Sequence, residues 1–259
     1  MLSLTSYQSP RSNNSSRTGL ASRLNSGVKP KGWNFMPVTD FKSKSRFDVS
    51  EYFKSKALED LDVSELAYAH LNRLNGKVHL SNCIVSSSLY DLIETAQSSF
   101  NNNRTRIYTP LLSCFAILDQ IGGAYGNHSN STQYQAGIKV ALATFSKYDK
   151  DEIEKLYSLR NGLYHDGSLV NISKNGNAKV VFRLSPEASS TITHPTTEWD
   201  GIYHDSVTQY ITKINTRKFK EDIEDIIERC ATELLNGTLT IKISDPREFF
   251  YKFLFASPL

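Results

Sequence analysis

The fold is decided in the middle of the chain, where residues 109–123 read TPLLSCFAILDQIGG. Apolar side chains recur at Leu111, Phe115 and Leu118, a spacing that places them on one face of an α-helix. Pro110 fits the first turn of such a helix, because the N–H that proline lacks has no helical partner there. This segment therefore predicts a helix that packs in the core.

The glycines that close this segment raise a second interpretation, a phosphate-binding loop. Gly122 and Gly123 are followed by neither the lysine nor the hydroxyl residue of such a loop, and no strand precedes them. We therefore expect them to mark a helix end or a close approach between two helices.

Three more helical patterns surround this one between Ser87 and Asp166, with short connections that suit antiparallel neighbours. We therefore expect a mainly α fold, an antiparallel helical bundle over residues 87–167, with a small α+β C-terminal extension. The apolar positions that mark the other helices are Leu89, Leu92, Ile93 and Ala96; Tyr134, Ile138, Ala141, Leu142 and Phe145; and Ile153, Leu156, Leu159 and Leu163.

The segments before the bundle differ from it in composition. Residues 1–32 are rich in Ser, Asn and Arg, and the first acidic residue is Asp40, so we expect a disordered basic arm; a transit peptide is the alternative. Residues 33–86 are predicted to form an N-terminal helical extension. Asp62 followed by Glu65 is typical of a helix start within it.

Residues 168–259 are predicted to form the α+β extension. Its expected elements are strands at 169–172 and 178–184 joined by a turn at 174–177, a long helix at 215–236 that ends at Asn236-Gly237, a strand at 239–243 and an aromatic helix at 249–255.

Composition narrows the class of protein. The net charge of +3 argues against wholesale coating of nucleic acid, although a local basic patch remains compatible with it. Three widely spaced cysteines fit a reducing, cytoplasmic location, and we expect Cys114 and Cys230 to fill the core. No metal site, cofactor or membrane span is expected, because no ligand spacing or long apolar run occurs.

The segment with chemical information is residues 156–167, LYSLRNGLYHDG. Arg160 and His165 are five positions apart, which separates them by about 140° around an ideal helix. Near the helix end, before Gly167, a looser turn would let both side chains reach one cleft. Asn161 and His165 are four positions apart and therefore share a face.

This segment resembles the signature of the HEPN superfamily (higher eukaryotes and prokaryotes nucleotide-binding), an Arg and a polar residue followed by a His a few positions later. The resemblance covers about a third of the chain and implies a helical bundle. The helix around residues 111–119 resembles the family's earlier core helix, in which Asp119 matches an acidic residue that faces the motif.

The resemblance implies a metal-independent endoribonuclease, of the kind found in toxin–antitoxin and antiviral-defence systems. His165 is the expected acid or base, since histidine titrates near neutrality, and Arg160 is expected to meet the negative charge on the phosphate. Asn161 would orient His165 or bind the phosphate, and Asp119 would hold Arg160. One histidine does not supply both acid and base, so the resemblance also implies a homodimer or a paired homologue, with an antitoxin or regulatory partner as a further partner.

The RNA contacts predicted outside this set are Arg104, Arg106 and Tyr164, although a solvated turn is the favoured explanation of the two arginines. The alternative function is a non-catalytic nucleotide-binding or protein-interaction module, because an Arg and a His also cap a helix C-terminus. His194 and His204 are interpreted as surface histidines.

Overall fold

The computed structural model describes residues 36–72, 76–127, 133–173 and 178–259; the predicted arm and the turn at 174–177 lie outside them. The helical elements are η1 Val38–Ser43, α2 Arg46–Lys54, η2 Leu58–Asp60, α3 Val63–Leu71, α4 Ser88–Phe100, α5 Thr109–Ala124, α6 Gly137–Phe145, α7 Lys150–Asn161, η3 Gly162–Asp166, η4 Thr208–Tyr210, α8 Thr216–Asn236 and α9 Pro246–Phe253. The strands are β1 Lys77–His79, β2 Cys83–Ser87, β3 Tyr125–Asn127, β4 Val170–Ile172, β5 Lys179–Leu184, β6 Ile192–Thr193, β7 Ile211–Ile214, β8 Leu239–Ile241 and β9 Leu254–Pro258.

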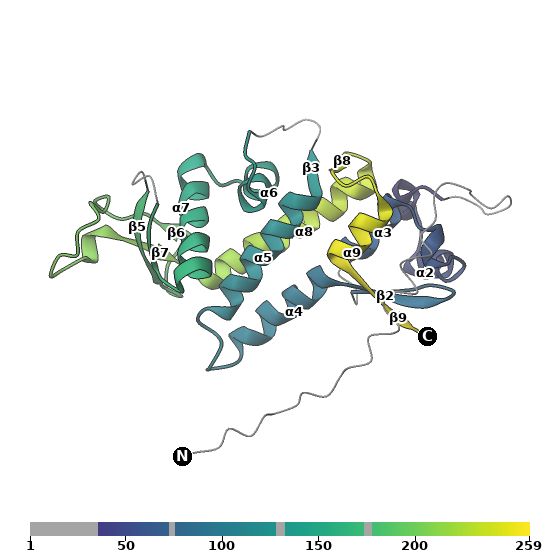
Figure 1. Ribbon diagram of the computed structural model, residues 1–259, viewed down its shortest axis with the longest axis horizontal. Coiled ribbons are helices and arrows are strands. Elements are labelled where there is room, and N and C mark those ends of the chain that lie inside the picture. Colours follow the sequence, from purple (N-terminus) through teal and green to yellow (C-terminus); the bar gives the residue numbers. More distant parts are fainter. Residues whose placement is uncertain (1–35, 73–75, 128–132, 174–177) are drawn as a thin grey trace, which may run out of the picture.

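Helix α5 forms the centre of the core, as its apolar pattern predicts. It packs against α4, α6 and α8, which surround it in Figure 1. Leu111, Phe115 and Leu118 are completely buried. The long helix α8 contributes one apolar face to the same core, including Phe219 and Ile227. Apolar burial between these helices is therefore the main source of stability here.

The molecule is elongated, with a small sheet at each end of the helical centre (Figure 1). A four-stranded sheet of order β4-β5-β7-β6 lies beside α7, and its β5–β7 pair is parallel. At the other end β1, β2 and β9 form an antiparallel sheet. A third sheet pairs β3 with β8, joining Tyr125 to Ile241.

The predicted fold class, a mainly α bundle with a small α+β extension, is wrong. The described residues form a mixed α/β structure in which strands also occur before and within the helical stretch, as β1, β2 and β3. These strands are three to five residues long, too short for a clear alternation of apolar and polar residues. Two of them pair with the far end of the chain, β2 with β9 and β3 with β8, and sequence reasoning does not detect such pairings.

Local signals at helix ends are confirmed. The Asp62 carboxylate accepts hydrogen bonds from the backbone N–H groups of Ser64 and Glu65, both at 2.9 Å, and so caps α3. Gly237 ends α8 with φ of +73°, a conformation that favours glycine. Cys114 and Cys230 are buried, and burial raises the pKa of the Cys114 thiol to about 12. None of the described helices has the length and apolar composition of a membrane-spanning segment.

Candidate functional site

The predicted motif lies at the end of α7, where the helix changes geometry. Helix α7 begins at a capping box formed by Asp149 and Glu152. After Asn161 the chain continues as one wider π-helical turn, Gly162–Asp166, and ends at Gly167 with φ of +60°. Single π-turns within α-helices are rare and frequently occur at functional sites.

The wider turn changes which side chains share a face. A π-turn advances by about 80° per residue rather than about 100°, so Arg160 and His165 are about 60° apart around the axis instead of about 140°. The wider turn therefore reduces the angular separation that an ideal α-helix would give these two positions. The loosening that the sequence suggests before Gly167 is present as this turn.

Gly162 explains why the wide turn fits here. A Cβ at this position would lie 2.8 Å from the carbonyl oxygen of Ser168 and 3.1 Å from that of Val170. The chain thus folds back tightly over the turn, and the Ser168 N–H donates to the Gly162 carbonyl at 3.0 Å. Any larger residue would push β4 away from the end of α7.

Three side chains hold the Arg160 guanidinium. Its Nη2 donates to Asp119 Oδ2 at 3.1 Å, and its Nη1 donates to Asn161 Oδ1 at 3.3 Å. The guanidinium also lies over the Tyr164 ring, 4.8 Å from the ring centroid. Arg160 is 24% exposed and Asp119 34%, so the pair is partly accessible to solvent. The buried Nε of Arg160 has no hydrogen-bond partner among the described residues.

Asp119 has a second contact that is purely structural. Its Oδ1 accepts the backbone N–H of Ile138, at 3.2 Å, in the first turn of α6. At Gly137, which begins this helix, a Cβ would lie 2.7 Å from the Asp119 carbonyl oxygen. One carboxylate therefore joins α5, the start of α6 and the end of α7.

Tyr164 supports Arg160, a role that the sequence did not indicate. Its hydroxyl donates to the Leu112 carbonyl of α5 at 2.8 Å, which holds the ring beneath the guanidinium. Burial raises the pKa of this hydroxyl, with a smaller contribution from Asp119. The spacing of four residues between Arg160 and Tyr164 was the available signal, since such pairs are neighbours on a helix.

The remaining predicted site residues lie at the surface. His165 is exposed and forms no hydrogen bond or ion pair with any residue in the described part of the chain. Arg104 and Arg106 are exposed in the connection between α4 and α5, and so are not in contact with the Asp119–Arg160 pair. The structure thus brings Asp119, Arg160 and Asn161 into contact and leaves His165 open to solvent.

A second polar cluster on α7 was not predicted. The Lys155 ammonium donates to Asp151 at 2.9 Å, to His194 Nδ1 at 3.0 Å and to Glu198 at 3.1 Å. Burial by itself lowers the pKa of Lys155. The carboxylates of Asp151 and Glu198 together raise this pKa by more than burial lowers it, so the net shift is upward. This cluster fastens the segment after β6 to α7. Asp151 and Lys155 are four residues apart, but His194 and Glu198 are too far from them in sequence to be grouped by spacing.

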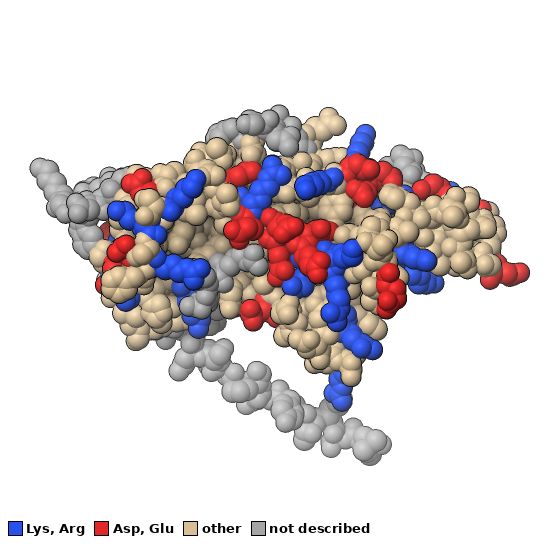
Figure 2. Space-filling view, turned by 180° about the vertical axis from the view of Figure 1, so that it is seen from behind, with Lys and Arg blue, Asp and Glu red and all other residues tan. Residues whose placement is uncertain are grey.

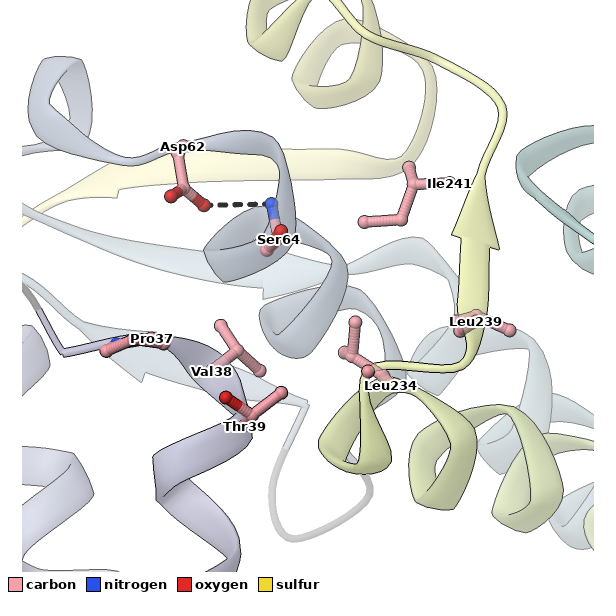
Figure 3. A pocket seen from close by; sticks show the side chains of 9 residues that line it. Pro37, Val38, Thr39, Asp62, Ser64, Leu234, Leu239 and Ile241 are labelled. Carbon is pink, nitrogen blue, oxygen red and sulfur yellow. Dashed lines mark hydrogen bonds between the residues drawn. The ribbon is translucent and has the colours of Figure 1, made fainter. Parts of the chain in front are cut away.

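A hollow of about 240 Å³ lies away from the motif, between η1, the start of α3 and the end of α8 (Figure 3). Its walls are mixed, with apolar Val38, Leu234 and Ile241 beside polar Thr39 and Ser64. The carboxylate at its rim, Asp62, is already occupied by the N–H of Ser64. No His, Cys, Asp and Glu side chains within the described ranges are grouped so as to hold a metal ion.

Comparisons with protein families, with curated proteins and with solved structures found no match to this chain. The function is therefore inferred from the residues of the site and from their chemistry.

Proposed function

We propose that this protein is a metal-independent endoribonuclease whose active site contains Arg160, Asn161 and His165. One observation supports this most. The surface guanidinium of Arg160 is held by Asp119 and Tyr164 at the helix end where a π-turn presents His165 to solvent. A fixed cation and an unengaged imidazole at the same helix end supply the two kinds of group that cleavage of RNA by its own 2′-hydroxyl requires.

In the proposed reaction, His165 takes the proton from the 2′-hydroxyl, and the 2′-oxygen forms a bond to the adjacent phosphorus. The bond from phosphorus to the 5′-oxygen breaks, and an acid protonates that oxygen as it leaves. Arg160 stabilises the added negative charge with its planar donors, and Asn161 contacts both the phosphate and the guanidinium. The products are a 2′,3′-cyclic phosphate and a 5′-hydroxyl.

Within the described contacts, the titrating groups beside Arg160 are Asp119 and Tyr164, and both are engaged, Asp119 with Arg160 itself and Tyr164 with the Leu112 carbonyl. We infer that a second copy completes the site, with its own His165 acting as the acid. The exposure of His165 and Tyr164 leaves this surface available to such a partner. The protein is then a homodimer, and light scattering at micromolar concentration tests this; a monomer that still cleaves RNA contradicts the two-chain site.

The central experiment measures cleavage of single-stranded RNA by wild-type protein and matched variants. His165→Ala and Arg160→Ala abolish cleavage, whereas His79→Ala and Arg247→Ala, which change exposed residues elsewhere, leave it intact. Activity survives EDTA, and products carry 2′,3′-cyclic phosphate ends. Circular dichroism shows that all four variants keep the wild-type fold. Cleavage that persists in His165→Ala places the active site elsewhere.

A non-catalytic binding module is the second candidate, and one observation favours it. Asp119 neutralises Arg160 and also holds the start of α6, so the ion pair has a structural reason to exist. If wild-type protein leaves a broad set of RNAs intact, with and without metal ions, and no inhibitor copurifies, this function replaces the ribonuclease. Arg160→Ala then weakens binding of a nucleotide or a protein partner instead.

The biological setting is part of the proposal. A ribonuclease without cofactor requirement suits a cytoplasmic toxin or an antiviral-defence effector, which a cell must restrain with an antitoxin or regulatory partner. Expression of the wild-type chain without that partner should slow growth, and expression of His165→Ala should not. Equal growth in the two cultures contradicts the toxin proposal.

A further inference from the structure

Three exposed arginines lie near one end of α5. Arg104, Arg106 and Arg217 are exposed, and none forms an ion pair with a residue in the described ranges. Lys44, Lys77 and Lys213 are likewise exposed without an ion pair in the described ranges, so it is the grouping of the three arginines that distinguishes this region. Other basic side chains do have a carboxylate partner. Examples are Lys54 with Glu51 at 2.7 Å, Lys139 with Glu154 at 2.7 Å, Arg229 with Glu233 at 3.0 Å and Lys252 with Glu248 at 2.6 Å.

The three arginines come from distant parts of the sequence but lie in one region. The Arg217 guanidinium, in the first turn of α8, lies 5.8 Å from the centroid of the Phe100 ring at the end of α4. Arg104 and Arg106 follow in the connection that Phe100 begins. This connection forms the lower edge of the molecule in Figure 1, where Figure 2 shows a column of Lys and Arg side chains beside an acidic band.

Exposed apolar and aromatic side chains accompany these charges. Ile107 is 53% exposed and Tyr108 is 43% exposed, immediately before α5 begins. Arginines interleaved with an exposed aromatic ring are typical of surfaces that hold single-stranded nucleic acid, since the cations meet phosphates and the ring stacks on a base. An acidic partner protein would satisfy the charges but gives no reason for the exposed ring.

The region leads directly to the proposed active site. The Leu112 N–H donates to the Tyr108 carbonyl, and the Leu112 carbonyl accepts the Tyr164 hydroxyl that supports Arg160. Tyr108 and Leu112 are therefore one helical turn apart, about 6 Å along α5. The first turn of α5 therefore links this region to the residues that hold Arg160.

We propose that Arg104, Arg106, Arg217 and Tyr108 form a binding surface for single-stranded RNA that guides the strand to Arg160. The name "basic surface" refers to these four residues. The proposal rests on the proposed ribonuclease function for the direction of the strand, but RNA binding is measured separately from cleavage. The basic surface binds the backbone through phosphate contacts and one stacked base, so it has little sequence preference.

The experiment uses the full-length His165→Ala protein, so that the probe stays intact. Fluorescence anisotropy measures its affinity for a labelled oligouridylate over a series of salt concentrations. Changing the three arginines of the basic surface to alanine lowers the affinity about tenfold or more. It also reduces the slope of log K against log salt by about 2, because each lost phosphate contact on a single strand contributes about 0.7.

Two matched variants control for charge and folding. The first control changes three basic residues outside the basic surface to alanine, namely Lys54 in α2, Arg229 in the later part of α8 and Arg247 in α9. It removes the same number of positive charges, and its RNA affinity and salt slope stay near those of the parent. Changing the three arginines of the basic surface to lysine keeps the charges and retains most of the slope. Thermal melts confirm that each variant is folded.

The outcomes separate the two proposals. If the alanine variant of the basic surface binds RNA as the control variant does, or if the parent binds no RNA at low salt, the binding surface is refuted. If the wild-type protein nevertheless cleaves RNA, the proposed ribonuclease function stands without this binding surface. If the wild-type protein binds RNA through the three arginines but does not cleave it, the binding surface is supported and the ribonuclease function is refuted. Binding of polyglutamate that RNA does not displace assigns the surface to an acidic protein and also refutes the proposal.

Discussion

Two neighbouring glycines in α5 should respond in opposite ways to the same substitution. At Gly122 a Cβ would lie 1.8 Å from the carbonyl oxygen of Gly137, which is backbone and has no rotamer by which to move aside. At Gly123 nothing lies within 4 Å of a Cβ. Gly122→Ala therefore forces α6 away from α5, whereas Gly123→Ala adds a methyl group in open space.

The structure sets the magnitudes. Adding atoms to a tightly packed contact lowers the free energy of unfolding by about 1–3 kcal/mol. Because the Cβ at Gly122 would clash with backbone, we expect Gly122→Ala to lower it by about 3 kcal/mol. Gly123→Ala stabilises the protein by about 0.5 kcal/mol, because alanine loses less chain entropy in a helix than glycine does. At about 2–4 °C per kcal/mol for a chain of this size, the melting temperature of Gly122→Ala falls by about 6–12 °C, and that of Gly123→Ala rises slightly.

Thermal melts followed by circular dichroism at 222 nm (the usual helical signal) compare the two variants directly. Because Asp119 holds the start of α6, Gly122→Ala also disturbs the carboxylate that binds Arg160, so any RNA cleavage falls with it. A Gly122→Ala protein that melts at or above the wild-type temperature would refute the close α5–α6 contact.

Three further predictions concern other parts of the structure. Burial lowers the pKa of His70 to about 4, and its ring bonds to Tyr125 and Gln120 in the neutral form, so stability is full above about pH 6.5 and is lost as pH falls toward 4. The lost free energy of unfolding is about 3 kcal/mol, which corresponds to a pKa shift of about 2.5 units. Urea unfolding should therefore show a stability that depends less on pH in His70→Gln than in the wild type. Equal pH dependence in the two proteins would contradict a buried neutral His70. Gly162→Ala should displace β4 and lower the melting temperature by several degrees. RNA cleavage should fall more in this variant than in Gly123→Ala. If melting temperature and cleavage both stay at the wild-type values, the close approach of the chain at Gly162 is refuted. Asp62→Ala removes the cap of α3 and should cost about 1 kcal/mol in urea unfolding, while Asp62→Asn should restore most of it.

Local chemistry carried enough information to locate many elements in advance. The apolar spacing of α5 and α8, the Asp62 cap and the Gly237 stop depend on residues within a few positions of one another, so a single sequence reveals them. The arginine and histidine of the motif, and the loosening of the helix between them, were also visible at this range. The bond from Arg160 to Asp119 was expected only through the family resemblance, and it is present at 3.1 Å.

Tertiary structure alone decided the rest. The β2–β9 and β3–β8 pairings join segments more than 100 residues apart, and each strand is too short to be recognised from its sequence. The contact between Tyr164 and Leu112, the Lys155 cluster and the meeting of Arg217 with Phe100 likewise depend on how helices pack. Residue periodicity determines which face of an element is buried, but the partner of that face is chosen by the free energy of the whole packed core, in which short strands and single charges have a small share.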